Sequence, residues 1–356
     1  MSPTLSMLMI LLACLGAFAY AADLSKKCPD VDPWNYTVLL PDTTDCSKYF
    51  SCHSGTPIQL PCPPGLHFND NLKVCDYPRN ANCVPRCSAL VDDEGGHWTP
   101  ESCSSGFNDQ GATCSVVCNK DYELKGSAFV QCTENGWNSS NGNFIPRCLP
   151  VDCIAEDLED ELNKTLSVNA GLLFVLDESG SVSLADFIKT KEFVKDIVTQ
   201  FPLSANRSAG VITFDSSSVV RINLNENSTT QFLSKVDKIG YRGGGTNILD
   251  ALRRAIIEIN TNAVHNLTLV FLITDGVSTT DGTPAANEIK SKNNALFTIG
   301  VSQSKLLHLE SLASTGDNGI KHFFHIRSYD ILQSIGKYLN PPAGSGGSTG
   351  SKCKSK

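Results

Sequence analysis

The sequence predicts a multidomain protein in which two small, disulfide-rich β modules precede an α/β domain with a doubly wound sheet. Twelve of the fifteen cysteines lie between Cys28 and Cys148, a stretch without any long periodic run. After residue 170, short apolar runs alternate with stretches of helical period, which is the pattern of βα units. A chain of 356 residues has room for two or three such domains.

The amino-terminal residues predict secretion. An apolar run over residues 7–22 is too short to span a bilayer, and it contains Ala19-Tyr20-Ala21, a small-x-small cleavage pattern. We therefore expect a signal peptide over residues 1–21 and a secreted, extracellular protein without a membrane span. Six Asn-x-Ser/Thr sequons agree with secretion and predict a glycoprotein. The expected glycosylation sites are Asn35, Asn138, Asn163, Asn206, Asn227 and Asn266.

The first module, over residues 25–84, contains six cysteines and many aromatic residues for its length. So small a segment needs disulfides to hold it together. Exposed aromatic rings can stack on the apolar faces of sugar rings, and the alternative is that the rings only fill space between the disulfides. The aromatic residues are Trp34, Tyr36, Tyr49, Phe50, Phe68 and Tyr77.

The cysteine spacing of this module resembles that of the peritrophin-A chitin-binding family, and so do the stretches 48–52, 65–69 and 74–78. The resemblance implies a hairpin-rich fold whose partner is chitin. Its implied chitin-binding residues are Tyr49, Phe50, Phe68, Asn69 and Tyr77, the last at a position where the family often has Trp. Six cysteines alone leave the disulfide connectivity open. The pairs implied by the resemblance are Cys28–Cys52, Cys46–Cys83 and Cys62–Cys75.

The second module, over residues 85–150, contains six further cysteines and short alternating runs that predict small antiparallel strands. The stretch from Cys118 to Gly126, Gly136-Trp137 and Pro146-Arg147-Cys148 resemble the sushi (complement control) family. The resemblance implies a spacer or a protein-binding surface. Its implied disulfides are Cys87–Cys132 and Cys118–Cys148, with Cys103–Cys114 as the extra bridge of a family variant.

Two segments flank the third domain. Residues 151–169 carry a run of acidic side chains and predict a solvated linker or short helix, and residues 341–356 predict a flexible, Gly/Ser-rich tail. Each segment contains one cysteine. Cys153 and Cys353 either form a bridge that closes the third domain, which we favour, or Cys353 pairs with another molecule.

The third domain, over residues 170–340, alternates strand-like and helix-like runs, which predicts a doubly wound parallel sheet. Strands are expected at 172–176, 210–214, 268–273, 295–301 and near 323–326. Helices are expected at 183–201, 248–259 and 329–339.

Three polar loops follow or open elements of this sheet. They are Asp177-Glu178-Ser179-Gly180-Ser181, the run from Gly243 to Asn247, and Thr274-Asp275-Gly276. In open parallel sheets such loops meet at the carboxyl ends of the strands. Their oxygen atoms suit a hard cation such as Mg²⁺. The alternative for the first loop alone is that Asp177 and the serines cap the following helix.

Together the loops resemble the metal-ion-dependent adhesion site (MIDAS) of the von Willebrand factor type A domain, which has a Rossmann-like α/β fold. The resemblance implies a cofactor, Mg²⁺ or alternatively Mn²⁺ or Ca²⁺. It also implies a partner, an extracellular protein ligand that offers an Asp or Glu carboxylate to the metal. The implied metal residues are Asp177, Ser179, Ser181, Thr246 and Asp275.

Other chemistries do not fit the sequence. The run Gly243-Gly244-Gly245 lacks the Lys-Ser/Thr of a phosphate loop, and His322 and His325 lack a third zinc ligand nearby. A net charge of −8 without a basic cluster outside the tail argues against nucleic acid. No nucleophile-elbow triad or pair of carboxylic acids indicates an enzyme.

We therefore expect a secreted, non-enzymatic adhesion or extracellular matrix protein that links chitin to a protein. The alternative is an innate immune recognition protein, complement-like, that binds chitinous microbes.

Overall fold

A computed structural model describes residues 27–92, 94–139, 145–165, 169–276, 278, 280–302, 306–316, 319, 321–340 and 353. The expected signal peptide, and the expected tail apart from Cys353, lie outside these residues. The chain divides into two compact units. The first holds residues 1–90, 105–113 and 131–137, and the second holds 91–104, 114–130 and 138–356.

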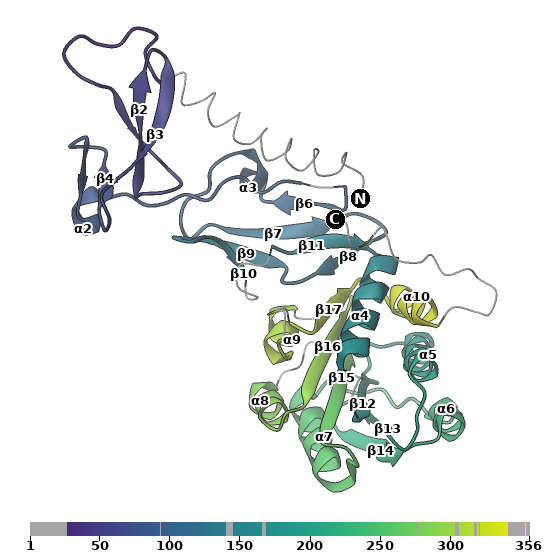
Figure 1. The fold of residues 1–356 in the computed structure, drawn as a ribbon. Helices are drawn as coiled ribbons and strands as arrows, with labels where there is room; N and C mark the ends of the chain where they lie inside the picture. Colours follow the sequence, from purple (N-terminus) through teal and green to yellow (C-terminus); the bar gives the residue numbers. More distant parts are fainter. Residues whose placement is uncertain are drawn as a thin grey trace. The chain divides into compact units, whose positions relative to one another are not determined.

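The first unit contains a small β fold (Figure 1), and disulfides staple it. Strands β1 (Leu39–Pro41), β2 (Lys48–His53) and β3 (Thr56–Pro61) form an antiparallel sheet. β4 (His67–Asn69) pairs with β5 (Val74–Asp76), and the helix α2 (Pro78–Ala81) follows. The β2–β3 turn needs Gly55, whose φ of +76° is in the left-handed region.

The segment after residue 90 adds short strands to the chain. They are β6 (Gly96–Thr99), β7 (Thr113–Cys118), β8 (Tyr122–Lys125), β9 (Phe129–Thr133), β10 (Gly136–Ser139) and β11 (Arg147–Pro150), with α3 (Ser102–Ser105) between β6 and β7. β6 and β7 pair antiparallel, with Gly96 opposite Cys118. The strands agree with the small antiparallel elements expected here.

The second unit is built on an eight-stranded sheet of order β11-β8-β17-β16-β15-β12-β13-β14. Strands β12 (Ala170–Asp177), β13 (Arg207–Phe214), β15 (Leu267–Thr274), β16 (Ala295–Val301) and β17 (Phe323–Ile326) run parallel, where the sequence predicts strands. The sheet is mixed because β14 (Ser218–Glu226) pairs antiparallel with β13 and β8 pairs antiparallel with β17.

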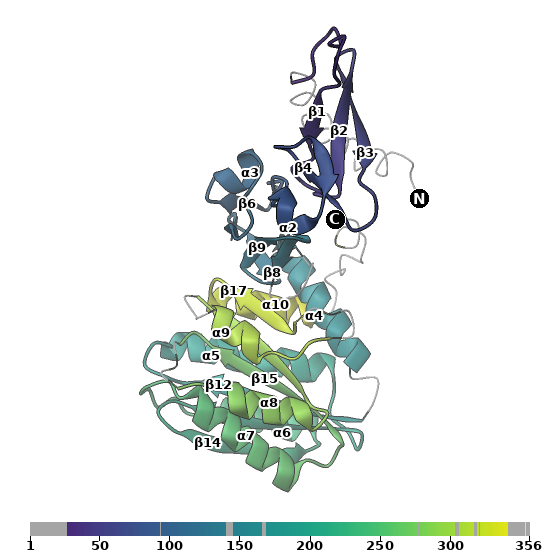
Figure 2. The same ribbon diagram turned by 90° about the vertical axis from the view of Figure 1, so that its left-hand side faces the viewer.

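Helices cover both faces of this sheet (Figure 1). On one face lie α5 (Leu184–Gln200), α6 (Thr229–Asp237) and α10 (Tyr329–Leu339). On the other lie α7 (Ile248–Asn262), α8 (Thr283–Ser291) and α9 (Leu306–Leu312), and Figure 2 shows α7 and α8 in front of the sheet from that side. No described helix has the length and apolarity that crossing a membrane requires.

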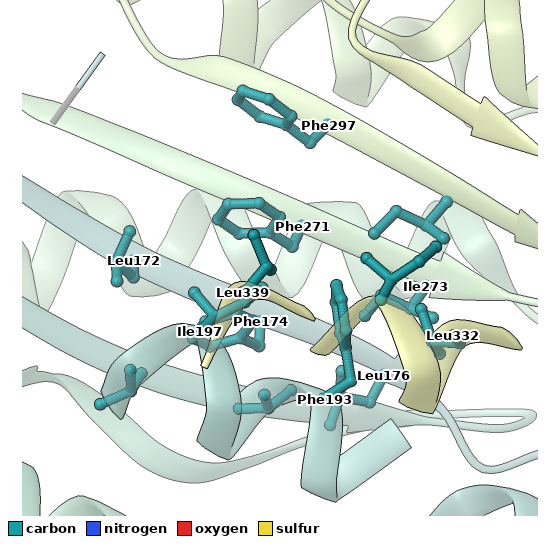
Figure 3. Packing of buried hydrophobic residues seen from close by; sticks show 14 of the residues in the cluster. Leu172, Phe174, Leu176, Phe193, Ile197, Phe271, Ile273, Phe297, Leu332 and Leu339 are labelled. Carbon is teal, nitrogen blue, oxygen red and sulfur yellow. The ribbon is translucent and has the colours of Figure 1, made fainter. Parts of the chain in front are cut away.

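The central strands are apolar on both sides because both faces are covered. β12 is buried at every position. Its alternate residues Leu172, Phe174 and Leu176 face α5 and α10, where Phe193, Ile197, Leu332 and Leu339 pack against them (Figure 3). The intervening Leu173 and Val175 face the core under α7 and α8.

The segments before the sheet differ in part from what the sequence predicts. Residues 151–165 form the helix α4 (Val151–Thr165), which agrees with the helical form of the prediction, but this helix is not solvated on all sides. Its acidic side chains lie on one face, while Ile154, Leu158 and Leu162 are buried in the main core. In the second module, β8 and β11 are part of the large sheet, an arrangement that the sequence did not predict.

Candidate metal centre and sugar-binding surface

The first polar loop starts at the carboxyl end of β12, where Asp177 is 2% exposed. One oxygen of its carboxylate accepts a hydrogen bond from Ser179 N at 2.8 Å, and the other accepts from the hydroxyl of Thr274 at the end of β15. The loop is not a helix cap. The N-cap of α5 is Ser183, whose hydroxyl accepts from Asp186 N, so the capping alternative for Asp177, Ser179 and Ser181 is wrong.

The two serines extend a chain of polar contacts from this loop to the third one. Ser179 Oγ lies 3.0 Å from Ser181 Oγ, and Ser181 Oγ donates to Asp275 Oδ1 at 2.7 Å. Ser179 is buried and Ser181 is exposed. The cluster therefore reaches from the buried end of β12 to solvent.

The second loop brings Thr246 to the same cluster. A Cβ atom added at Gly276 would lie 2.8 Å from Thr246 Oγ1 and 3.2 Å from Asp177 Oδ2, so all three residues adjoin. Gly243 and Gly244 have φ values of +80° and +131°, which explains the glycine run. Gly244 O accepts from Gly180 N at 2.7 Å and ties the second loop to the first.

All five residues predicted from the sequence thus converge at one edge of the sheet. Burial raises the pKa of Asp177 to about 6 and also raises the pKa of Asp275. Among the described residues, no lysine or arginine forms an ion pair with either carboxylate. The cluster offers only oxygen atoms and lacks positive charge, which fits a hard divalent cation.

A divalent cation at this cluster would be held by two carboxylates and three hydroxyls. The described part of the chain contains no group of three or more His, Cys, Asp or Glu side chains arranged around a metal, so a site here depends on the hydroxyls. The two histidines considered from the sequence have other partners. His322 Nδ1 lies 2.8 Å from Glu161 Oε2, and His325 Nε2 lies 2.9 Å from Ser302 O.

Sequence reasoning missed a set of side chains, centred on the buried Glu178, that hold the loops. Glu178 is fully buried, and its carboxylate contacts Arg242 Nε at 2.7 Å and Arg221 at 3.0 Å. Arg242 also bridges to Asp215 at 3.1 Å. The Tyr241 hydroxyl lies 2.7 Å from Val182 O. The sequence offered little sign of these contacts. Glu178 is a charged residue directly after an apolar strand, and Tyr241-Arg242 follows far along the chain.

In the first module the structure corrects the predicted sugar contacts. Phe68 is 2% exposed and stacks on Tyr49 with ring centroids 4.9 Å apart, and Phe50 is also buried. Asn69 is buried as well, and its amide donates to Asn80 O. Phe50, Phe68 and Asn69 therefore support the fold and expose little surface to solvent. Tyr77, at 61% exposure, stays available.

Two further aromatic side chains of this module face solvent, Trp34 at 95% exposure and Tyr36. Arg79 lies over the Tyr77 ring, 5.8 Å from its centroid. The exposed rings, rather than the buried Phe50 and Phe68, are a surface on which sugar rings can stack.

The structure forms seven disulfides, with the pairs expected from the sequence. They are Cys28–Cys52, Cys46–Cys83, Cys62–Cys75, Cys87–Cys132, Cys103–Cys114, Cys118–Cys148 and Cys153–Cys353. The last bridge joins α4 to the segment after α10, so Cys353 is paired within the chain. All six sequon asparagines are exposed.

Comparison with known proteins identifies two of the three modules. Residues 172–337 match the family model of the von Willebrand factor type A domain, and residues 25–83 match that of the Chitin binding Peritrophin-A domain. The chain therefore combines a peritrophin-A chitin-binding domain with a type A domain. Domains of these two kinds are typically non-enzymatic, and disulfide-rich proteins that contain them are typically extracellular.

Among curated relatives, Peritrophin-1 of Anopheles gambiae is 48% identical over 75 residues, 21% of this chain and 48% of that protein. The Sushi, von Willebrand factor type A, EGF and pentraxin domain-containing protein 1 of Rattus norvegicus is 28% identical over 184 residues. That match covers 49% of this chain and 5% of the rat protein. The chain spans less than half the length of either relative. A sushi module is shown only by the name of the rat protein, so that assignment stays a prediction.

Among solved structures, proximal thread matrix protein 1 from the mussel byssus is similar with a TM-score of 0.42 and 23% identity. The match covers 48% of this chain and 45% of the mussel chain, whose MIDAS motif is occupied by zinc in that structure.

Proposed function

We propose that this protein is a secreted, extracellular component of a chitin-containing matrix, which holds chitin through residues 25–84 and binds a protein ligand through a divalent cation at Asp177, Ser179, Ser181, Thr246 and Asp275. The observation that carries the proposal is the convergence of these five oxygen-bearing side chains in a chain that also contains a chitin-binding domain.

On the chitin side, the exposed rings of Trp34, Tyr36 and Tyr77 provide the contact. Flat aromatic rings present apolar faces to sugar rings at a small cost in side-chain entropy. Because the three disulfides of this module hold its strands, the exposed rings are presented by a fold that does not need to order on binding.

On the metal side, Ser179, Ser181 and Thr246 would supply hydroxyl oxygens, and Asp177 and Asp275 would supply carboxylates directly or through water. A bound cation would offset the charges of both carboxylates and leave a coordination position that a carboxylate of the protein ligand fills. Ser181 is the exposed member of the cluster, so the ligand approaches from its side.

The chitin arm is tested by retention of the full chain on insoluble chitin. We expect wild type to be retained, and Trp34→Ala combined with Tyr77→Ala to reduce retention at unchanged thermal stability, because both side chains are exposed. Phe68→Ala is the contrasting variant. It removes a buried ring, which should destabilise the module by about 3–5 kcal/mol, so we expect the module to unfold. Equal retention of wild type and the exposed-ring variant would refute this surface.

The metal arm is tested by capturing proteins from an extracellular matrix extract with immobilised wild type, with or without EDTA, and with Asp177→Ala. A ligand that binds through the cation is released by EDTA and absent from Asp177→Ala, and it returns when Mg²⁺ is restored to wild type. Capture of the same proteins under all conditions contradicts a metal-dependent role.

A further inference from the structure

Thr246 differs from the other candidate metal residues in how its side chain is held. Hydrogen bonds of their own side chains hold four of the five, which are Asp177, Ser179, Ser181 and Asp275. Among the residues that the structure describes, no hydrogen bond reaches the hydroxyl of Thr246. The position of this hydroxyl therefore depends on the backbone that carries it and on packing against Gly276.

The backbone around Thr246 belongs to neither a helix nor a strand, since residues 239–247 have no regular structure. Arg242 stands in this connection, directly before the second loop. Its Nε donates to Glu178 Oε1 at 2.7 Å, on the first loop. Its Nη2 donates to Asp215 Oδ1 at 3.1 Å and to Ser217 O at 3.0 Å, in the turn between β13 and β14. One guanidinium group thus ties the connection to two other parts of the domain.

The backbone of the second loop is bound at the same two places. At its start, Gly243 N donates to Glu178 O at 3.1 Å. At its end, Asn247 N donates to Asp215 O at 2.9 Å. The guanidinium group of Arg242 contacts the side chains of the same two acceptors, so each attachment of the loop is made twice, once by backbone and once by a side chain.

The composition of the second loop explains why it needs such an attachment. Gly243 and Gly244 both have positive φ values, and glycine loses more conformational freedom on folding than any other residue. A glycine-rich segment that is released at its start samples many conformations. The hydroxyl of Thr246 would then be spread over many positions, because no side-chain hydrogen bond holds it.

We propose that Arg242 is a positioning residue for the metal centre, which holds the second loop against the first so that the Thr246 hydroxyl is in place for the cation. The proposal rests on the proposed metal-binding function. It adds that the site is prepared before the metal arrives, by a side chain that is not itself a metal ligand.

Arg221 provides a matched control. Its Nη2 donates to the same carboxylate of Glu178 at 3.0 Å, and its Nε donates to Thr213 Oγ1 at 2.7 Å. Within the described part of the chain, Arg221 makes no hydrogen bond to the second loop. Loss of either arginine removes one positive charge beside Glu178, which by itself would strengthen the binding of a cation nearby. Weaker binding after loss of Arg242 therefore has the opposite sign to the charge effect.

The test uses the full chain, stripped with EDTA and titrated with Mn²⁺ by calorimetry. Outer-shell partners of metal ligands contribute about 10–100-fold to metal affinity. Arg242 acts through backbone, one step farther from the metal, so we expect Arg242→Met to weaken Mn²⁺ binding about fivefold or more. Arg221→Met should stay within about twofold of the wild-type affinity.

Arg242→Lys separates the charge from the geometry, and it also carries the test if Arg242→Met does not fold. Lysine keeps the positive charge, but its single ammonium group lacks the planar fork that contacts Glu178 and Asp215 together. We expect Arg242→Lys to bind Mn²⁺ about as weakly as Arg242→Met does.

A second measurement examines the loop without metal. Amide hydrogen exchange over residues 243–247 should be faster in Arg242→Met than in wild type, and unchanged in Arg221→Met. Exchange at the wild-type rate in Arg242→Met would refute the attachment of the loop, whatever the metal affinity.

The possible outcomes separate this proposal from the one on which it rests. If wild type binds no Mn²⁺, the metal-binding function fails and the positioning role fails with it. If wild type binds Mn²⁺ and Arg242→Met binds it equally well, only the positioning role is refuted. Equal weakening by Arg242→Met and Arg221→Met, or wild-type affinity in Arg242→Lys, would also overturn it, because either result would assign the effect to the charge beside Glu178.

Discussion

Replacement of Gly276 by alanine tests the geometry of the metal centre with the smallest possible change. The added Cβ would lie 2.7 Å from Thr246 Cγ2, 2.8 Å from Thr246 Oγ1 and 3.2 Å from Asp177 Oδ2. Ordinary contacts of a Cβ begin at 3.4 Å, so Thr246 would have to move by about 0.6–0.7 Å and Asp177 by about 0.2 Å. Both are proposed to hold the cation, and the methyl group therefore disturbs two metal residues at once.

Crowding of this kind costs about 1–3 kcal/mol of folding stability. If the five residues form the metal centre, the displacement should also weaken Mn²⁺ binding about tenfold or more. Calorimetric titration gives the affinity, and thermal unfolding without metal gives the stability. The two measurements separate damage to the centre from damage to the domain.

Gly240→Ala is the matched control, because nothing lies within 4 Å of a Cβ at Gly240, which is in the same connection between α6 and α7 as the glycine run. It should leave both quantities at the wild-type value. Wild-type affinity in Gly276→Ala, together with a lowered unfolding temperature, would refute the assignment of Thr246 and Asp177 to the metal.

Three further predictions concern the second unit. Cys353→Ser opens a disulfide that spans 200 residues and should lower the free energy of unfolding by about 2–5 kcal/mol in urea titrations. An unchanged urea midpoint would contradict the role of this bridge in closing the domain. Arg242→Met leaves the buried carboxylate of Glu178 with Arg221 as its remaining cation and should cost about 1–3 kcal/mol, whereas the exposed Arg253→Met should cost nothing measurable. For Glu161, burial acts to raise the pKa, but the hydrogen bond from His322 and the charge of Lys125 hold the pKa below its ordinary 4.5. Its stabilising contribution is therefore complete above pH 4.5 and is lost as the pH falls through the folded-state pKa. The difference in unfolding free energy between wild type and Glu161→Gln should therefore shrink between pH 6 and pH 3. A constant difference would exclude this linkage.

The sequence predicts the central sheet well because its strands are buried on both faces. β12, β15 and β16 are uninterrupted apolar runs between polar loops, and such runs have few alternative structures. β14 was missed because its exposure alternates unevenly and the strand is interrupted by a register shift opposite β13. An edge strand with one exposed face leaves a weaker pattern in the sequence.

The acidic residues of α4 concealed its buried face. Ile154, Leu158 and Leu162 have helical spacing, but the charges between them outweigh this signal when composition is considered alone. The pairing of β8 with β17 could not be predicted, since the contact joins residues about 200 positions apart. The sequence of neither strand indicates the strand with which it pairs.

The convergence of the five candidate metal residues could be predicted because each lies at the end of a strand or in a loop beside one or before a helix, where topology alone brings loops together. The side chains that hold these loops in place could not be predicted from the sequence. Glu178, Arg221 and Arg242 act through contacts that depend on the packed positions of several elements, and these contacts cannot be read from a single sequence. In the first module, the resemblance implied five sugar contacts, but Phe50, Phe68 and Asn69 are in the core of this small fold, whereas Tyr77 is exposed.

The pairing of β8 with β17 has a consequence for how the chain folds. β8 is synthesised early, while its partner and Cys353 come near the end of the chain. Contacts over such separations slow folding, because a long loop must close before they form. Until then β8 and the buried carboxylate of Glu123, which accepts from Arg327 in the folded chain, lack their partners. β8 is then an open edge to which other chains can attach. The completed sheet therefore needs the chain from β8 to β17, and fragments that end before β17 should aggregate.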